Sequence, residues 1–120
     1  MSTDPRSLAT TYLTSWKAGD FDAIRAILTD DVSFRGVLGA TDGIDETIAG
    51  LQGMARMIRD IEVVRMVAEG DDVMTWYDLH TTVAPDPVPT VNWSHVRDGK
   101  IAAIRAVFDP RPILPPGGSA

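Results

Sequence analysis

The first part of the chain carries apolar residues at helical spacing. The residues on this apolar stripe are Leu8, Tyr12, Leu13 and Trp16. Asp4 and Pro5 stand just before the stripe, and this pair suits a helix N-cap followed by the first helical residue. Gly19 follows the stripe, and glycine is common just beyond the end of a helix. The pattern therefore predicts an amphipathic helix that runs through Ala18.

A second helix, a short strand and a third helix are predicted next. Asp20 can cap a short helix, which forms a helical hairpin with the first. Residues 32–38 alternate as a short strand does, and the segment after them is read as a loop. A helical stripe then covers residues 44–58, with Thr41 or Asp42 as its expected cap.

After Asp60 the pattern changes to the alternation and the continuous apolar runs that are typical of strands. The predicted strands are residues 61–68, 73–83, 90–97 and 100–109. Residues 84–89 contain three prolines, Pro85, Pro87 and Pro89, which cannot donate backbone hydrogen bonds to a sheet. This segment is therefore expected to be a hairpin loop. Asp98-Gly99 predicts a two-residue turn, because both positions of a type I′ turn need positive φ.

Helices gathered before an antiparallel meander indicate an α+β fold. We expect a cone-shaped barrel in which three N-terminal helices cover a curved, mostly antiparallel sheet and enclose a conical space. The 120 residues suit a single domain, which we place at residues 4–109. Residues 110–120 are read as a tail rich in Pro and Gly.

The composition argues against several classes of protein. The formal net charge is −6 and the arginines are scattered, whereas nucleic-acid binding needs clustered Lys and Arg. No apolar run approaches the roughly 18 residues of a membrane span, and the N-terminus lacks a signal-peptide pattern. Without cysteine there is no disulfide framework or thiolate metal site. We therefore expect a cytoplasmic protein with neither a membrane nor a nucleic acid as partner.

The candidate chemistry begins with Asp109, at the end of the last apolar strand. An Asp in this place is either a solvated strand terminus or a carboxylate that faces a pocket. The second predicted strand offers two faces, which are Trp76, Asp78 and His80 on one side and Thr75, Tyr77 and Leu79 on the other. The first set would give a pocket an aromatic ring, a carboxylate and an imidazole. The second would give it a mostly apolar wall with one phenol.

The two histidines are candidate proton-transfer groups, because imidazole titrates near neutral pH. His80 and His95 could also bind a metal together with Asp78 or Asp109. Their spacing matches no recognised metal signature, so we expect neither a metal nor a cofactor.

Three aromatic residues of the first half are candidates for the wall of a pocket. Tyr12 and Trp16 lie on the first helical stripe, and their polar tips need partners if they are buried, which favours a pocket edge. Phe34 is read as cavity lining or core.

Several stretches resemble the nuclear transport factor 2-like superfamily. Residues 12–22 with Asp30-Asp31 resemble its opening helical hairpin, and residues 98–101 with Val107-Phe108-Asp109 resemble its closing hairpin. The resemblance spans residues 8–108 and implies the α+β cone described above. This superfamily includes steroid delta-isomerases, limonene-1,2-epoxide hydrolases and SnoaL polyketide cyclases. One fold hosts all of these activities, so the resemblance implies a small hydrophobic ligand without choosing a reaction.

The resemblance to steroid isomerases implies a role for Tyr12, which stands where those enzymes have an oxyanion-donating tyrosine on the first helix. Gly36 holds the place of their aspartate base, and their second acid falls near Trp93. The chain therefore lacks both acids of that active site.

The resemblance to epoxide hydrolases depends on Val107-Phe108-Asp109, which is similar to the Tyr-Phe-Asp that ends their last strand. It implies that Asp109 activates water and that Asp78, at the matching place or one residue from it, acts as the acid. Phe34 and Gly36 stand where those enzymes hold the water with Tyr and Asn, and neither residue can hold it.

Two hypotheses follow. In the first, the protein is an isomerase, cyclase or epoxide hydrolase in which Asp109 is the general base, with its pKa raised by desolvation, and Asp78 or Tyr12 is the proton donor. In the second, it is a non-catalytic module for ligand binding or dimerisation. The other residues expected at the ligand are Trp16, Phe34, His80, Trp93 and His95. Large residues on the outer face of the sheet also predict a homodimer through that face.

Overall fold

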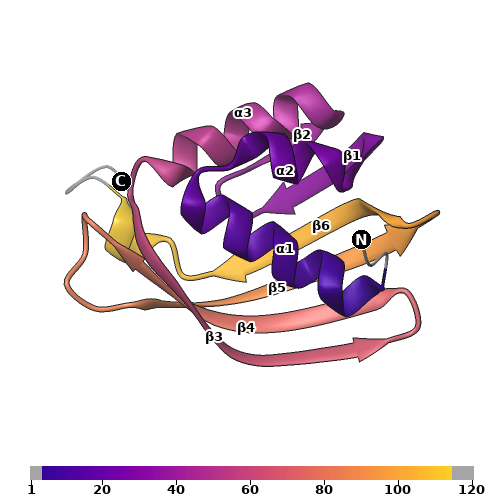
Figure 1. Cartoon of the computed structure of the whole chain (residues 1–120). Coiled ribbons are helices and arrows are strands. Elements are labelled where there is room, and N and C mark those ends of the chain that lie inside the picture. Colours follow the sequence, from indigo (N-terminus) through magenta and orange to yellow (C-terminus); the bar gives the residue numbers. More distant parts are fainter. Residues whose placement is uncertain (1–3, 115–120) are drawn as a thin grey trace.

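The computed structural model describes residues 4–114, which form three α-helices on one face of a six-stranded sheet (Figure 1). The helices are α1 (Pro5–Ala18), α2 (Phe21–Ala26) and α3 (Ile44–Ala55). The strands are β1 (Leu28–Gly36), β2 (Gly39–Asp42), β3 (Ile58–Glu69), β4 (Asp72–Thr81), β5 (Val88–Arg97) and β6 (Lys100–Phe108). A 3-10 turn, Arg111–Ile113, follows the last strand.

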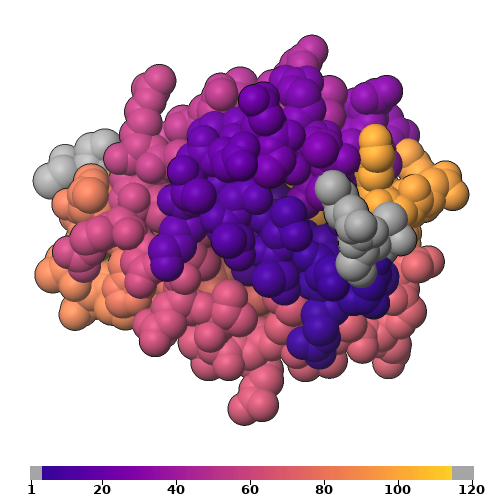
Figure 2. Space-filling view, viewed as in Figure 1, coloured from indigo at the N-terminus to yellow at the C-terminus, as the bar shows by residue number. Residues whose placement is uncertain are grey.

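The strand order is β2-β1-β6-β5-β4-β3, and every neighbouring pair is antiparallel except β1 and β6. The predicted α+β fold, with helices over a mostly antiparallel sheet, is therefore confirmed. The sheet curves under the helices, but it does not close into a barrel, because β2 and β3 are separate edges (Figure 1). In the space-filling view the indigo and violet atoms of α1 and α2 cover the centre of the molecule, and the light-orange atoms of the turn between β5 and β6 show at its right edge (Figure 2).

The helical hairpin begins and ends as its sequence predicts. The Asp4 carboxylate accepts a hydrogen bond from the backbone N–H of Ser7 at 3.2 Å, and Asp20 accepts one from Ala23 at 3.1 Å. Gly19 has a φ of 74°, a left-handed conformation that costs glycine nothing, and it ends α1. The local signals for capping are thus sufficient to set this part of the fold.

The segment from residue 28 to residue 43 differs from the prediction because strand pairing decides it. β1 begins at Leu28, opposite Ile101 of β6, and so starts before the strand that was predicted at residues 32–38. The expected loop contains β2, which pairs back on β1. Neither Thr41 nor Asp42 caps α3, whose N-cap is Gly43 without a side-chain hydrogen bond.

The meander β3 to β6 agrees with the prediction, with strand ends shifted by a few residues. The Asp98-Gly99 turn has φ values of 53° and 77°, as a type I′ hairpin needs. Of the predicted tail, Ile113 is buried, and residues 115–120 lie outside the described residues.

The core lies between the helices and the inner face of the sheet. Leu8, Tyr12, Leu13 and Trp16 form the buried stripe of α1. They pack in one cluster with side chains of the sheet that include Leu28, Tyr77, Leu79 and Ile104. The predicted amphipathic stripe therefore faces the sheet.

The buried side of β4 gives a direct test of this packing. Val73 is fully buried, whereas Val83, just after the strand, is 55% exposed. We expect Val73→Ala to lower the free energy of unfolding by about 2 kcal/mol, because two methyl groups lose their burial and leave a cavity. The same change at Val83 should stay within about 0.5 kcal/mol of the parent. Urea unfolding measures both changes in the free energy of unfolding. Equal effects of the two substitutions would contradict the buried position of Val73.

Candidate functional site

A pocket of about 260 Å³ lies between the helices and the inner face of the sheet. Its lining is Tyr12 and Trp16 of α1; Phe34, Gly36, Val37, Leu38, Gly39, Ala40 and Thr41 of the β1–β2 hairpin; Thr47, Gly50, Leu51 and Met54 of α3; and Tyr77, Leu79, Thr90, Asn92, Ala106 and Phe108 of the sheet. The volume is just below the roughly 300–1,000 Å³ of typical ligand pockets. The site therefore suits a small ligand.

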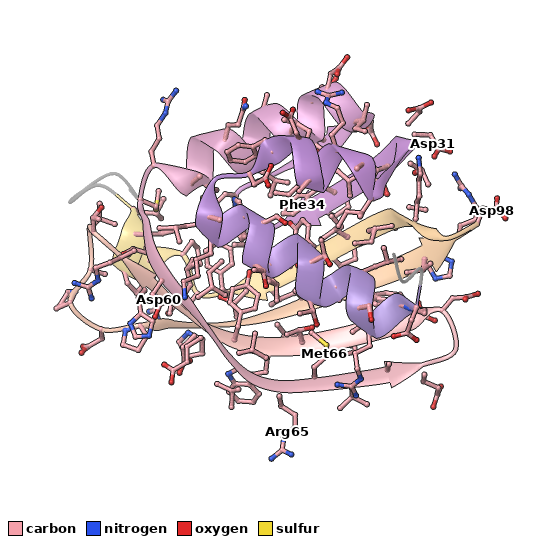
Figure 3. The ribbon with its side chains drawn as sticks, in the orientation of Figure 1. Asp31, Phe34, Asp60, Arg65, Met66 and Asp98 are labelled. Atoms are coloured by element: carbon pink, nitrogen blue, oxygen red, sulfur yellow. The ribbon has the colours of Figure 1, made fainter. Side chains whose placement is uncertain are left out.

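The aromatic wall on α1 is held in a fixed position. Tyr12 and Trp16 are four residues apart, which places them on the same helix face. Their ring centroids are 6.1 Å apart, and the Trp16 indole N–H donates a hydrogen bond to the Leu51 carbonyl at 2.9 Å. Phe34 lies in the layer between the helices and the sheet (Figure 3). The structure thus brings together in one pocket Tyr12, which was predicted as a proton donor, and Trp16 and Phe34, which were predicted at the ligand.

Several polar side chains of the lining already bond to other residues. The Thr41 and Thr47 hydroxyls form a hydrogen bond of 2.8 Å with each other. The Thr90 hydroxyl donates to the Val88 carbonyl at 3.1 Å, and the Asn92 amide donates to the Ser94 hydroxyl at the same distance. The pocket wall is consequently polar at a few defined points in an otherwise apolar surface.

Among residues 4–114, the only ionisable side chains of the lining are Tyr12 and Tyr77. Burial raises the pKa of Tyr12 well above its ordinary value, and the nearby Tyr77 phenol raises it further. Burial also raises the pKa of Tyr77. Both phenols are therefore neutral hydrogen-bond donors at physiological pH. The described part of the chain places no carboxylate, histidine, lysine or arginine in the lining, so these residues supply no general base that works near neutral pH.

Asp109 lies one residue beyond the pocket wall and turns away from it. Phe108 lines the pocket, but the Asp109 carboxylate pairs with the Arg111 guanidinium through hydrogen bonds of 2.7 to 3.1 Å. The Asp109 side chain is 47% exposed. Hydrogen bonds from Arg111 hold the pKa of Asp109 below its ordinary value, so the expected rise by desolvation is wrong. Of the two alternatives for this residue, the structure shows the solvated strand terminus.

The other predicted polar residues lie on the outer face of the sheet. In β4 the buried side is Thr75, Tyr77 and Leu79, so Asp78 and His80 point away from the pocket, and His80 contacts Glu62 at 3.2 Å. In β5 the buried side is Thr90, Asn92 and Ser94, which leaves Trp93 and His95 outside. Both donate hydrogen bonds to the Asp72 carboxylate, at 2.9 and 2.8 Å. None of these four residues lines the pocket.

Tyr77, Thr90 and Asn92 are pocket residues that were not among the predicted site residues. The sequence did offer Tyr77 as a candidate, because residues of a strand alternate between its two faces. The face that Tyr77 shares with Thr75 and Leu79 was one of the two that could form the pocket wall. In the sequence, Asn92 looks like any other polar residue of a strand. Only its burial in the structure, where 2% of the residue is exposed, identifies it as a candidate site residue.

Two further classes of site are absent from residues 4–114. No group of three or more acidic, histidine or cysteine side chains in this part of the chain is arranged to hold a metal ion. No helix of the same residues is long and apolar enough to cross a membrane.

Comparison with known proteins identifies the family. A family model described as a SnoaL-like domain matches residues 9–104, which is most of the chain. The chain belongs to the SnoaL-like domain family. The predicted membership in the nuclear transport factor 2-like superfamily is thereby confirmed. No curated protein is similar enough in sequence to be called a relative of this SnoaL-like chain.

Solved structures show the same fold at low sequence identity. A protein from Kribbella flavida has a TM-score of 0.86 at 24% identity, over 93% of this chain and 92% of that one. A de novo designed protein with a curved β-sheet has a TM-score of 0.81 at 20% identity, over 92% and 90%. An epoxide hydrolase from M. tuberculosis, described as LEH-like, has a TM-score of 0.76 at 24% identity, over 92% and 86%. Likeness at this level extends to the fold alone.

Both tyrosines of the SnoaL-like chain line the pocket. The absorbance change on ionisation of the tyrosines therefore reports on the pocket alone. Because burial raises both pKa values, the stability from the neutral phenols is complete below the ordinary value of 10.0 and is lost as pH rises through the folded values. We expect no tyrosinate absorbance near pH 10 in the folded protein and ionisation together with unfolding in stronger alkali. Denatured protein should titrate near 10.0. Reversible ionisation of either tyrosine near that value, with the fold intact by circular dichroism, would contradict the buried placement.

Proposed function

We propose that this SnoaL-like protein binds a small, uncharged and mostly apolar molecule in the pocket between its helices and its sheet. The observation that carries the proposal is a ligand-sized pocket whose lining contains aromatic and aliphatic side chains and no charged group. Tyr12, Trp16 and Phe34 are the predicted site residues that contact the ligand. A charged ligand would lose its hydration there without gaining an ionic partner, which is costly.

Non-catalytic binding is the reading that this geometry supports best. Epoxide hydrolysis with Asp109 as the base would need its carboxylate inside the pocket, and that carboxylate is paired with Arg111 outside it. Asp78, the other predicted acid, lies on the outer face. Tyr12 can donate a hydrogen bond to a bound oxygen, but a neutral phenol with a raised pKa is a poor base.

A simple apolar probe tests ligand binding. We expect tetralin, a two-ring hydrocarbon, to bind and to shift the NMR signals of pocket residues such as Leu51 and Leu79. Ala106→Trp places an indole in the pocket and should abolish these shifts, because Ala106 lines the wall. Asp109→Asn should leave them unchanged. Failure of the parent protein to bind any small apolar probe would refute the proposal, and loss of binding in Asp109→Asn would return that carboxylate to the site.

The outer face of the sheet supports a second proposal, a homodimer. Five apolar side chains of β4, β5 and β6 form the outer-face patch, which consists of Met74, Trp76, Val91, Trp93 and Val107, each between 38% and 65% exposed. Trp76 pairs with Val91 and Val91 with Val107, while Met74 pairs with Trp93, so the members are direct cross-strand neighbours. Charged residues border the patch, and Arg65 of β3 projects from the molecule beside Trp76 (Figure 3). An exposed apolar patch with a polar rim is typical of a protein interface, and a two-fold dimer is the commonest solution.

Analytical ultracentrifugation at micromolar concentration tests the dimer. We expect the parent protein to sediment as a dimer and Val91→Glu to sediment as a monomer, because a carboxylate in the centre of the patch would be buried without a partner. Val83→Glu is the matched control, since Val83 is also exposed but lies in the β4–β5 loop, and it should remain dimeric. A monomeric parent protein, or identical behaviour of the two variants, would contradict this interface.

A further inference from the structure

Three buried residues that line the pocket have polar side-chain atoms without hydrogen-bond partners in residues 4–114. The side chains of Tyr12 and Tyr77 are only 1% and 2% exposed, and within residues 4–114 neither hydroxyl has a hydrogen-bond partner. Asn92 is 2% exposed and uses one N–H on Ser94, which leaves its carbonyl oxygen and its second N–H free in the same residues. A ligand that fills the pocket displaces water from these polar groups, and leaving them unpaired then costs free energy, so they favour a ligand that makes a polar contact here.

Two of these groups come from neighbouring strands of the sheet. Tyr77 of β4 pairs with Thr90 of β5, and Asn92 lies two residues further along β5 on the same face. Side chains in this diagonal relation are about 7–8 Å apart at the backbone, which long side chains can span. Thr75, the direct partner of Asn92, also has a buried hydroxyl without a partner. The floor of the pocket is therefore polar at one place, around Tyr77 and Asn92.

We infer that the ligand carries an uncharged oxygen acceptor, such as the carbonyl of a ketone, ester or lactone, and that Tyr77 and Asn92 determine this specificity. The inference depends on the proposed function and narrows its ligand class. The Tyr77 phenol donates to the ligand oxygen, and the free amide N–H of Asn92 provides a second donor nearby. A pure hydrocarbon would leave these groups unpaired, and a carboxylate would find no cation in the lining.

Three probes of similar shape separate the possibilities: tetralone, its hydrocarbon parent tetralin, and tetralin carboxylate, each titrated by calorimetry near neutral pH. We expect tetralone to bind about tenfold or more tighter than tetralin, from one net hydrogen bond or more, and the carboxylate not to bind. Tyr77→Phe should weaken tetralone about tenfold and leave tetralin unchanged, because only the hydroxyl is removed.

Two double variants complete the test. Asn92→Leu with Ser94→Ala removes both members of one hydrogen bond and should also lower the preference for tetralone. Thr41→Val with Thr47→Val is the matched control, because these pocket hydroxyls satisfy each other, and it should keep the preference. Unchanged tetralin affinity shows in each case that the pocket is intact.

The outcomes distinguish failure of the proposed function from failure of the role given to Tyr77 and Asn92. If no neutral probe binds, or if the carboxylate binds best, the proposed function fails. If tetralin binds as tightly as tetralone, or if Tyr77→Phe and the Asn92 variant keep the parent preference, the pocket binds uncharged ligands but the assignment of Tyr77 and Asn92 is wrong.

Discussion

The register between β4, β5 and β6 is the constraint on which the rest of the molecule depends. Tyr77 pairs with Thr90, and Thr90 pairs with Phe108, so three residues of the pocket wall form one row across the sheet. Side chains alternate between the two faces of a strand, and a slip of one residue would exchange those faces. The apolar face of α1 must be buried against one of them. Packing and pairing together therefore decide which half of each strand forms the pocket.

The two faces of the sheet place the polar side chains of the strands in two different environments. The inner face holds neutral donors and acceptors, which can be buried when they are hydrogen bonded. The acidic and basic side chains of the same strands lie outside, where water and ion pairs stabilise them. Asp72 is an example, because hydrogen bonds from His95 and Trp93 lower its pKa on the outer face. No charged side chain of residues 4–114 lines the pocket, and this is the basis of the proposal that its ligand is uncharged.

The family assignment and the site carry different information. Membership in the SnoaL-like family fixes the architecture, and a designed protein shares that architecture, so the fold by itself does not imply an activity. Function has to be argued from the groups that reach the ligand. Among the positions where the resemblance implied a carboxylate, one holds Gly36 and another holds Asp109, which is half-exposed outside the pocket. Tyr12, Tyr77 and Asn92 are polar residues that line the pocket. The polar residues in the pocket thus support the proposal of ligand binding rather than catalysis.

The sequence by itself determined the helical hairpin, the meander of strands and the Asp98-Gly99 turn, because capping residues, hydrophobic periodicity and turn glycines act through neighbours in the chain. It also placed Tyr12, Trp16 and Phe34 at a pocket. Only the tertiary structure decided the extent of β1, the existence of β2 and the direction of Asp109 and Asp78, since these depend on partners that are distant in sequence or on a choice between two equivalent strand faces. A period of two shows that the faces of β4 differ, but the packing of α1 on the sheet determines which face is buried.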